Sequence, residues 1–112
     1  CGKVDAIHVP TDNIIASSIP TLMAVANREK IPVYGAEVGH VKNGVLASES
    51  ISFYDIGHRA GQMAAEILKG NKTVKDFPVE GADKTKLYIN KSEMETLGIQ
   101  IPKEVLDRAE MI

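Results

Sequence analysis

The sequence predicts an α/β protein with a mainly parallel sheet and flanking helices. Short apolar runs alternate with longer segments of helical spacing, in the order strand, helix, strand, loop, strand, helix, strand, helix, helix. Such alternation is typical of parallel strands that are joined by helices. The chain has 112 residues, of which 44% are hydrophobic and 25% are charged, so it is long enough for one modest core and too short for two domains.

The N-terminal elements come from one apolar run and one helical pattern. Residues 4–9 are a short apolar run closed by a proline, which predicts a buried strand. Residues 14–30 have helical spacing, but Pro20 lacks the amide hydrogen that a helix interior requires. We therefore expect a first helical turn, a break near residues 17–18, and a main helix with Pro20 in its opening turn.

The middle of the chain predicts two more strands and the clearest helix. Residues 31–36 predict a second strand, and the glycines and Asn-Gly pair of residues 37–44 predict a loop. Residues 45–51 predict a third strand. Residues 53–69 form an amphipathic helix, because their apolar side chains recur along one stripe and a glycine follows.

The C-terminal third is less regular. Residues 71–86 are polar and predict a long connector, and residues 87–90 predict a short fourth strand. A short helix is expected over residues 91–97, because a glycine follows as its C-terminal cap. A last amphipathic helix is expected to open at Pro102 and to turn three apolar side chains inward, namely Val105, Leu106 and Ala109.

The charge and the motifs exclude several classes of function. The formal net charge is −2, and the 13 basic residues are mixed with 15 acidic ones, so no basic stripe supports nucleic-acid binding. No nucleophile elbow or phosphate-binding loop is present, and we expect no catalytic residues, no enzyme activity and no cofactor. The histidines and the cysteine lack metal-ligand spacing, which argues against a metal site at Cys1, His8, His40 (expected in a loop) and His58.

The start of the chain has two interpretations. The Cys1-Gly2 pair fits the lipid-bearing end of a mature lipoprotein, or a chain that begins within a longer protein. The strand pattern directly behind it favours the second, since a lipid anchor is normally followed by a polar tether. No run approaches the ~18 apolar residues of a membrane span.

Polar side chains follow the predicted strands and mark the candidate binding site. Thr11, Asp12 and Asn13 follow the first strand, Glu37 follows the second, and Ser50 is a weaker candidate near the end of the third. In open parallel sheets, ligands sit beyond the carboxyl ends of the strands. Carboxylates placed there suit an ammonium group or sugar hydroxyls. Two plainer interpretations remain open: a helix cap for Asp12 or Asn13, and a solvated loop acid for Glu37.

Several segments together resemble a known family. The chain is similar to ABC-transporter substrate-binding proteins of the group that includes tryptophan- and tyrosine-type binders. The likeness covers nearly the whole chain in the family's order. It lies in VDAIHVPTDN (4–13), VAN (25–27), IPV (31–33), VKNG (41–44), YDIG (54–57) with Gly61, ILKG (67–70), LGI (97–99) and IP (101–102).

The resemblance implies a periplasmic-binding fold of two α/β lobes that close on a ligand in the cleft between them. This chain would be the C-terminal part, residues 1–112, and helix 53–69 would pack on the N-terminal lobe. By position, Thr11, Asp12, Asn13 and Glu37 would line the cleft, and residues 50–51 would lie at a hinge between the lobes.

The resemblance also implies the protein's role. It implies a small-molecule solute such as an amino acid, with the family likeness suggesting an aromatic one, a membrane ABC permease as partner, and an extracytoplasmic location, either periplasmic or lipid-anchored. A ligand-sensing effector domain, as in lactose-repressor-type regulators, is the alternative with the same fold. An isolated chain is expected to bury the exposed stripe of helix 53–69 by dimerising or domain swapping.

Overall fold

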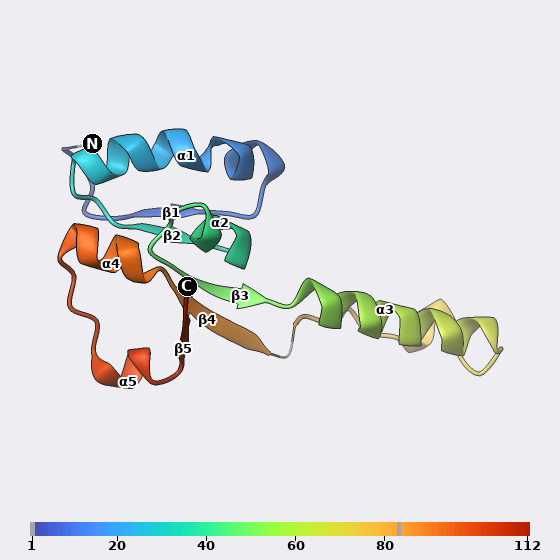
Figure 1. Cartoon of the computed structure of the whole chain (residues 1–112). Coiled ribbons are helices and arrows are strands. Elements are labelled where there is room, and N and C mark those ends of the chain that lie inside the picture. The colour runs from blue at the N-terminus through green and yellow to red at the C-terminus, as the bar shows by residue number, and fades with distance from the viewer. Residues whose placement is uncertain (1, 83) are drawn as a thin grey trace. The chain divides into compact units, whose positions relative to one another are not determined.

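A computed structural model describes residues 2–82 and 84–112 of the chain, coloured by residue number in Figure 1. The chain divides into two compact units. The first unit comprises the chain up to Ser50 and again from Lys86 onwards, and the second comprises Ile51–Thr85. Each unit is described by itself below.

The sheet has five strands in the order β1-β2-β3-β4-β5. Parallel pairing joins β1 to β2, β2 to β3, and β4 to β5. The predicted α/β class with a mostly parallel sheet is therefore confirmed. The strands are β1 (Ile7–Val9), β2 (Val33–Gly35), β3 (Ala47–Ile51), β4 (Thr85–Ile89) and β5 (Ala109–Met111).

Two hydrophobic clusters hold the first unit together. Helix α1 (Asn13–Arg28) packs against the first cluster, which contains Val9, Ile19, Met23, Ala26, Val33 and Val45. The second cluster contains Leu46, Ala47, Leu87 and Ile89. It is covered by apolar residues of α4 (Lys91–Leu97), of α5 (Lys103–Leu106) and of the segment between them.

Helix α1 runs unbroken through Pro20, so the expected break near residues 17–18 was wrong. The hydroxyls of Ser17 and Ser18 both donate to the carbonyl of Ile14 at 2.8 Å and thus stay within the helical turn. An interior proline costs about 3 kcal/mol, but burying each large apolar side chain returns roughly 1.5–3 kcal/mol. Tertiary packing of Ile19, Met23 and Ala26 therefore outweighs the proline.

A short helix, α2 (Val38–Lys42), replaces the loop expected over residues 37–44. Its His40 and Val41 are buried, and the side-chain amide of Asn43 donates to the carbonyl of Gly39 at 2.8 Å. Burial of these two side chains stabilises the short helix, although residues 37–44 include two glycines. The first strand also starts later than expected, since Val4 is exposed and β1 begins at Ile7.

The expected last helix is shorter than its pattern indicates. Helix α5 ends at Leu106, and Ala109 lies in β5 instead of on the inner face of a helix. Ala109 pairs with Leu87 in the parallel register, and the amide of Ile112 donates to the carbonyl of Ile89 at 2.8 Å. The backbone groups of residues 109–112 thus form hydrogen bonds with the edge of β4 instead of continuing the helix. The predicted helix over 91–97 is confirmed, and its C-terminal cap Gly98 has φ 68°.

The second unit is built on α3 (Phe53–Leu68), close to the predicted bounds 53–69. The hydroxyl of Ser52 caps it by accepting from the amide of Asp55 at 3.1 Å. No residue of α3 is buried. The polar connector that follows contains a 3₁₀ turn at Val74–Asp76, and Glu80 then pairs with Arg59 through two hydrogen bonds of 2.7 and 2.6 Å.

None of the helices in the described ranges is long and apolar enough to cross a lipid bilayer.

Candidate functional site

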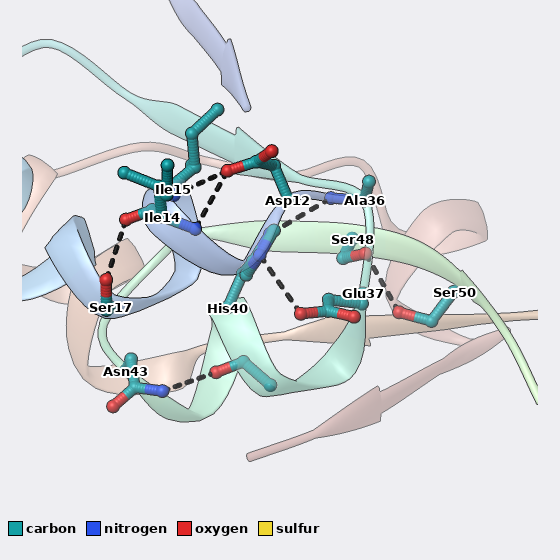
Figure 2. Close-up of polar contacts among 11 residues, drawn as sticks. Asp12, Ile14, Ile15, Ser17, Ala36, Glu37, His40, Asn43, Ser48 and Ser50 are labelled. Atoms are coloured by element: carbon teal, nitrogen blue, oxygen red, sulfur yellow. Dashed lines mark hydrogen bonds and ion pairs between the residues drawn. The ribbon is translucent and has the colours of Figure 1, made fainter. Parts of the chain in front are cut away.

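The candidate site lies at the carboxyl ends of β1, β2 and β3 in the first unit. Val9 pairs with Gly35, and Gly35 pairs with Ser48, so the three strands are in step near these ends. The residues that follow them emerge at one edge of the sheet, as Figure 2 shows for Asp12 and Glu37. The sequence prediction of a polar edge therefore agrees with the strand register.

Asp12 is the N-cap of α1. Its Oδ1 accepts hydrogen bonds from the amides of Ile14 at 2.8 Å and Ile15 at 3.0 Å (Figure 2). Both bonds end on the same oxygen, and within the described ranges Oδ2 makes none. The Asp12 side chain is exposed, so its carboxylate serves as the cap with one oxygen and leaves the other open to solvent.

Thr11 and Asn13 flank Asp12 at the same turn, and both are exposed. Ser50 differs from them, because it is only 2% exposed and its Oγ lies 2.8 Å from the Oγ of Ser48. The structure thus leaves Thr11, Asp12 and Asn13 exposed at the edge, whereas Glu37 is half-buried there. It places the Ser50 hydroxyl beneath that edge, in a buried pair.

Glu37 precedes α2 and lies beside a buried histidine that sequence reasoning assigned to a loop. The imidazole of His40 is 1% exposed, and its Nε2 is 3.2 Å from Oε1 of Glu37. On the other side of the ring, the amide of Ala36 donates to Nδ1 at 3.3 Å (Figure 2). The Glu-His spacing of three residues would have identified this pair if the short helix had been predicted.

The edge offers oxygen acceptors and no cluster of metal ligands. Among residues 2–82 and 84–112, no group of three or more His, Cys, Asp or Glu side chains is placed to hold a metal ion. Carboxylates that present single oxygens suit the hydrogen-bond donors of a small molecule, above all an ammonium group. The edge thus presents hydrogen-bond acceptors at the carboxyl ends of parallel strands, which is where open α/β sheets usually bind small molecules.

A hollow of about 620 Å³ lies on one face of the sheet in the first unit, and its lining reaches Ala36 and Ser48 near the carboxyl ends of β2 and β3. Its lining includes Tyr34, Leu87, Ile89 and Val105. This lining is continuous with the second hydrophobic cluster, and Tyr34 is 40% exposed. Such an apolar lining is typical of a sheet face that is not completely covered by helices.

Comparisons with known proteins identify the family. A family model described as ABC transporter substrate binding protein matches residues 1–112. The tyrosine-binding protein of Clostridioides difficile (strain R20291) is 43% identical over 99 residues, which cover 88% of this chain and 28% of that protein.

Solved structures give the same result. The ABC domain of Streptococcus pneumoniae in complex with L-Trp matches with a TM-score of 0.84 at 41% identity, over 98% of this chain and 37% of that one. The ligand-free, open structure of CD0873 from Clostridium difficile, a substrate-binding protein with adhesive properties, matches with a TM-score of 0.76 at 38% identity, over 99% of this chain and 37% of that one.

The chain belongs to the ABC transporter substrate-binding protein family. This is a family of binding proteins and not a class of enzymes. The chain spans about 28% of the length of the tyrosine-binding protein and about 37% of the two solved chains.

Proposed function

We propose that this chain is the C-terminal part of a two-lobed protein that binds an amino acid between its lobes and delivers it to an ABC permease. The observation that carries the proposal is the pair of acidic side chains at successive strand ends. Asp12 follows β1 and Glu37 follows β2, and the strands are in register. In a family of small-ligand binders, acceptors at this edge favour a ligand that carries an ammonium group.

The relatives support an aromatic amino acid as the solute. One relative is named for tyrosine, and the structure from Streptococcus pneumoniae contains L-Trp. The part of the site in this chain contacts the ammonium end, and the opposite lobe contributes the rest of the cleft. Closure of the lobes buries most of the ligand, so the edge alone is expected to bind weakly.

The proposal assigns the second unit to the other lobe. The boundaries between the units fall at Ser50 and Ile51 and again at Thr85 and Lys86, where a pair of hinge strands would cross. Helix α3 has no buried residue and exposes Phe53 and Leu68 by 57% and 87%. An amphipathic helix with an uncovered apolar stripe fits one that packs on a further domain.

The proposed location follows from the family. Substrate-binding proteins of ABC transporters are extracytoplasmic, and a membrane permease is their usual partner. We propose the same location and partner for this chain, with lipid anchoring as the attachment if the protein is not free in a periplasm.

Alone, the chain is expected to hide its apolar stripe by self-association. Dimerisation or domain swapping through α3 would bury side chains that are otherwise open to water. Light scattering of the 112-residue chain should show a mass that rises with concentration. A monomer at every concentration would contradict this part of the proposal.

Native mass spectrometry of the complete gene product, purified without denaturation, tests the function. We expect a bound species whose added mass is that of an amino acid. Asp12→Asn is the diagnostic variant, because asparagine caps a helix as well as aspartate does but carries no charge. It should lose the bound species and keep its unfolding temperature.

Asp55→Asn is the matched control, because it removes an exposed acid from the first turn of α3 in the second unit and should keep the bound solute. An empty spectrum that remains empty through a thermal-shift screen of all amino acids would overturn the proposed amino-acid binder and favour a ligand-sensing domain or another solute.

A further inference from the structure

The Glu37–His40 pair has a feature that simple packing does not account for. The His40 side chain is 1% exposed, yet its Nε2 has no properly aligned hydrogen-bond partner within the described ranges. Oε1 of Glu37 lies 3.2 Å from this nitrogen, but the two atoms do not form an aligned hydrogen bond. A buried polar atom without a partner costs about 1–3 kcal/mol, so it calls for an explanation.

The other ring nitrogen fixes where the proton lies. The amide of Ala36 donates to Nδ1 at 3.3 Å, so Nδ1 is an acceptor. In the neutral ring the proton is then on Nε2, the atom that faces Glu37. The imidazole is thus held by the backbone at the end of β2 and presents a donor to the carboxylate of Glu37.

The neighbouring chain is shaped to admit this ring. A Cβ added to Gly35 would lie 2.7 Å from the Cβ of His40, a distance that real Cβ atoms essentially never show, and 3.0 Å from its Nδ1. Gly35 therefore provides the space in which the imidazole packs against β2. The backbone amide, the glycine and the burial together fix the ring in one orientation.

We propose that His40 is a positioning residue, which holds the Glu37 carboxylate in the orientation that receives the ligand's ammonium group. This role rests on the proposed function. A glutamate side chain that rotates freely loses conformational entropy when it binds a ligand. A buried donor that orients the carboxylate beforehand reduces this loss. Closure on the ligand aligns Nε2 with Oε1 and satisfies the orphaned donor.

A double-mutant cycle on the complete gene product tests the role. The probes are L-tyrosine and L-tryptophan, and the measurement is isothermal titration calorimetry. His40→Leu should weaken binding roughly tenfold, within the range of coupling between residues in contact. The same change in a Glu37→Gln background should have little further effect, because His40 acts through the Glu37 carboxylate.

Two further variants separate positioning from simple packing. His40→Gln keeps a donor and an acceptor at the end of the side chain and should recover most of the lost affinity. Val41→Ala leaves a cavity at a residue that is 0% exposed on the same helix, and it should lower stability with little change in affinity. The proposal would be overturned if His40→Leu lowered the affinity equally in the wild-type and Glu37→Gln backgrounds. It would also be overturned if His40→Gln recovered none of the lost affinity.

Nuclear magnetic resonance gives a readout that needs no ligand. Long-range proton–nitrogen spectra should show the Nε2-protonated tautomer for His40 and a shifted Nε2 resonance in the Glu37→Gln variant. The opposite tautomer would overturn the positioning role and leave the proposed function standing. If the tautomer is as expected but neither amino acid gives heat, the proposed function fails, and the positioning role fails with it.

Discussion

The two units of the chain differ in how they bury their apolar side chains. The first unit has two hydrophobic clusters, with Ile19 and Ile89 at 0% and 1% exposure. The second unit is built on α3, which is as long as α1, but no residue of α3 is buried. The comparison shows that amphipathic spacing alone does not tell whether a helix is covered within its own chain.

The difference also separates two kinds of local stabilisation. In the first unit, packing overrides an unfavourable residue, since α1 continues through Pro20. In the second unit, stability within the chain depends on local contacts, such as the Ser52 cap and the pair of Arg59 with Glu80. Exposed local contacts of this kind contribute little to stability, which agrees with the proposal that α3 packs on a further domain.

The largest expected contrast comes from truncating one apolar side chain in each unit. Ile89→Ala should lower the free energy of unfolding by about 2–5 kcal/mol, because it leaves a cavity in a packed cluster. Leu68→Ala in α3 should change it by less than about 0.5 kcal/mol, since Leu68 is 87% exposed. Urea denaturation measures both, and equal losses would show that α3 is packed within this chain.

Substituting one glycine in each unit should change the stability by an intermediate amount. Gly35→Ala places a Cβ 2.7 Å from the Cβ of His40 and should destabilise the chain by about 1–3 kcal/mol. Gly61→Ala meets nothing within 4 Å and lies inside α3, so it should stabilise that helix by about 0.5–1 kcal/mol. Thermal unfolding followed by circular dichroism checks the opposite signs. If Gly61→Ala lowered the stability, the face of α3 that carries Gly61 would be in close contact with another segment in solution.

The smallest effect concerns the exposed ion pair of the second unit. The hydrogen bonds from Arg59 hold the pKa of the Glu80 carboxyl below its usual range. Because the folded pKa is lowered, the contribution of this pair is complete at neutral pH and is lost as pH falls through the lowered value. Carbon-13 titration of Glu80 should show this, and Arg59→Leu should return the pKa toward that of a free glutamate. A Glu80 that titrates in the usual range without the substitution would contradict the pairing.

The sequence predicted the class of fold and the polar edge because both depend on short-range patterns. Apolar runs marked the strands, and the residues after them marked the carboxyl ends of parallel strands. The positions of Asp12 and Glu37 shortly after β1 and β2 could therefore be predicted, and their role in ligand binding stays a prediction. The relative placement of side chains within the edge depends on register and on local helices, which periodicity does not reveal.

The errors have the same physical origin. Burial of Ile19 and Met23 keeps α1 intact at Pro20, and burial of His40 and Val41 forms α2 from a glycine-rich segment. Ala109 becomes part of β5 because the edge of β4 offers unpaired backbone groups. In each case a tertiary contact overrode a local preference, and His40 was missed as a partner of Glu37 for this reason.

Hydrogen–deuterium exchange can test whether the first unit is stable by itself and whether α3 packs on another lobe, as proposed. The 112-residue chain, diluted until it is monomeric, and the complete gene product are compared under the same conditions. We predict that amides of the first unit exchange slowly in both, whereas amides of α3 exchange fast in the chain and slowly in the complete protein. Equal exchange of α3 in both proteins would contradict the account.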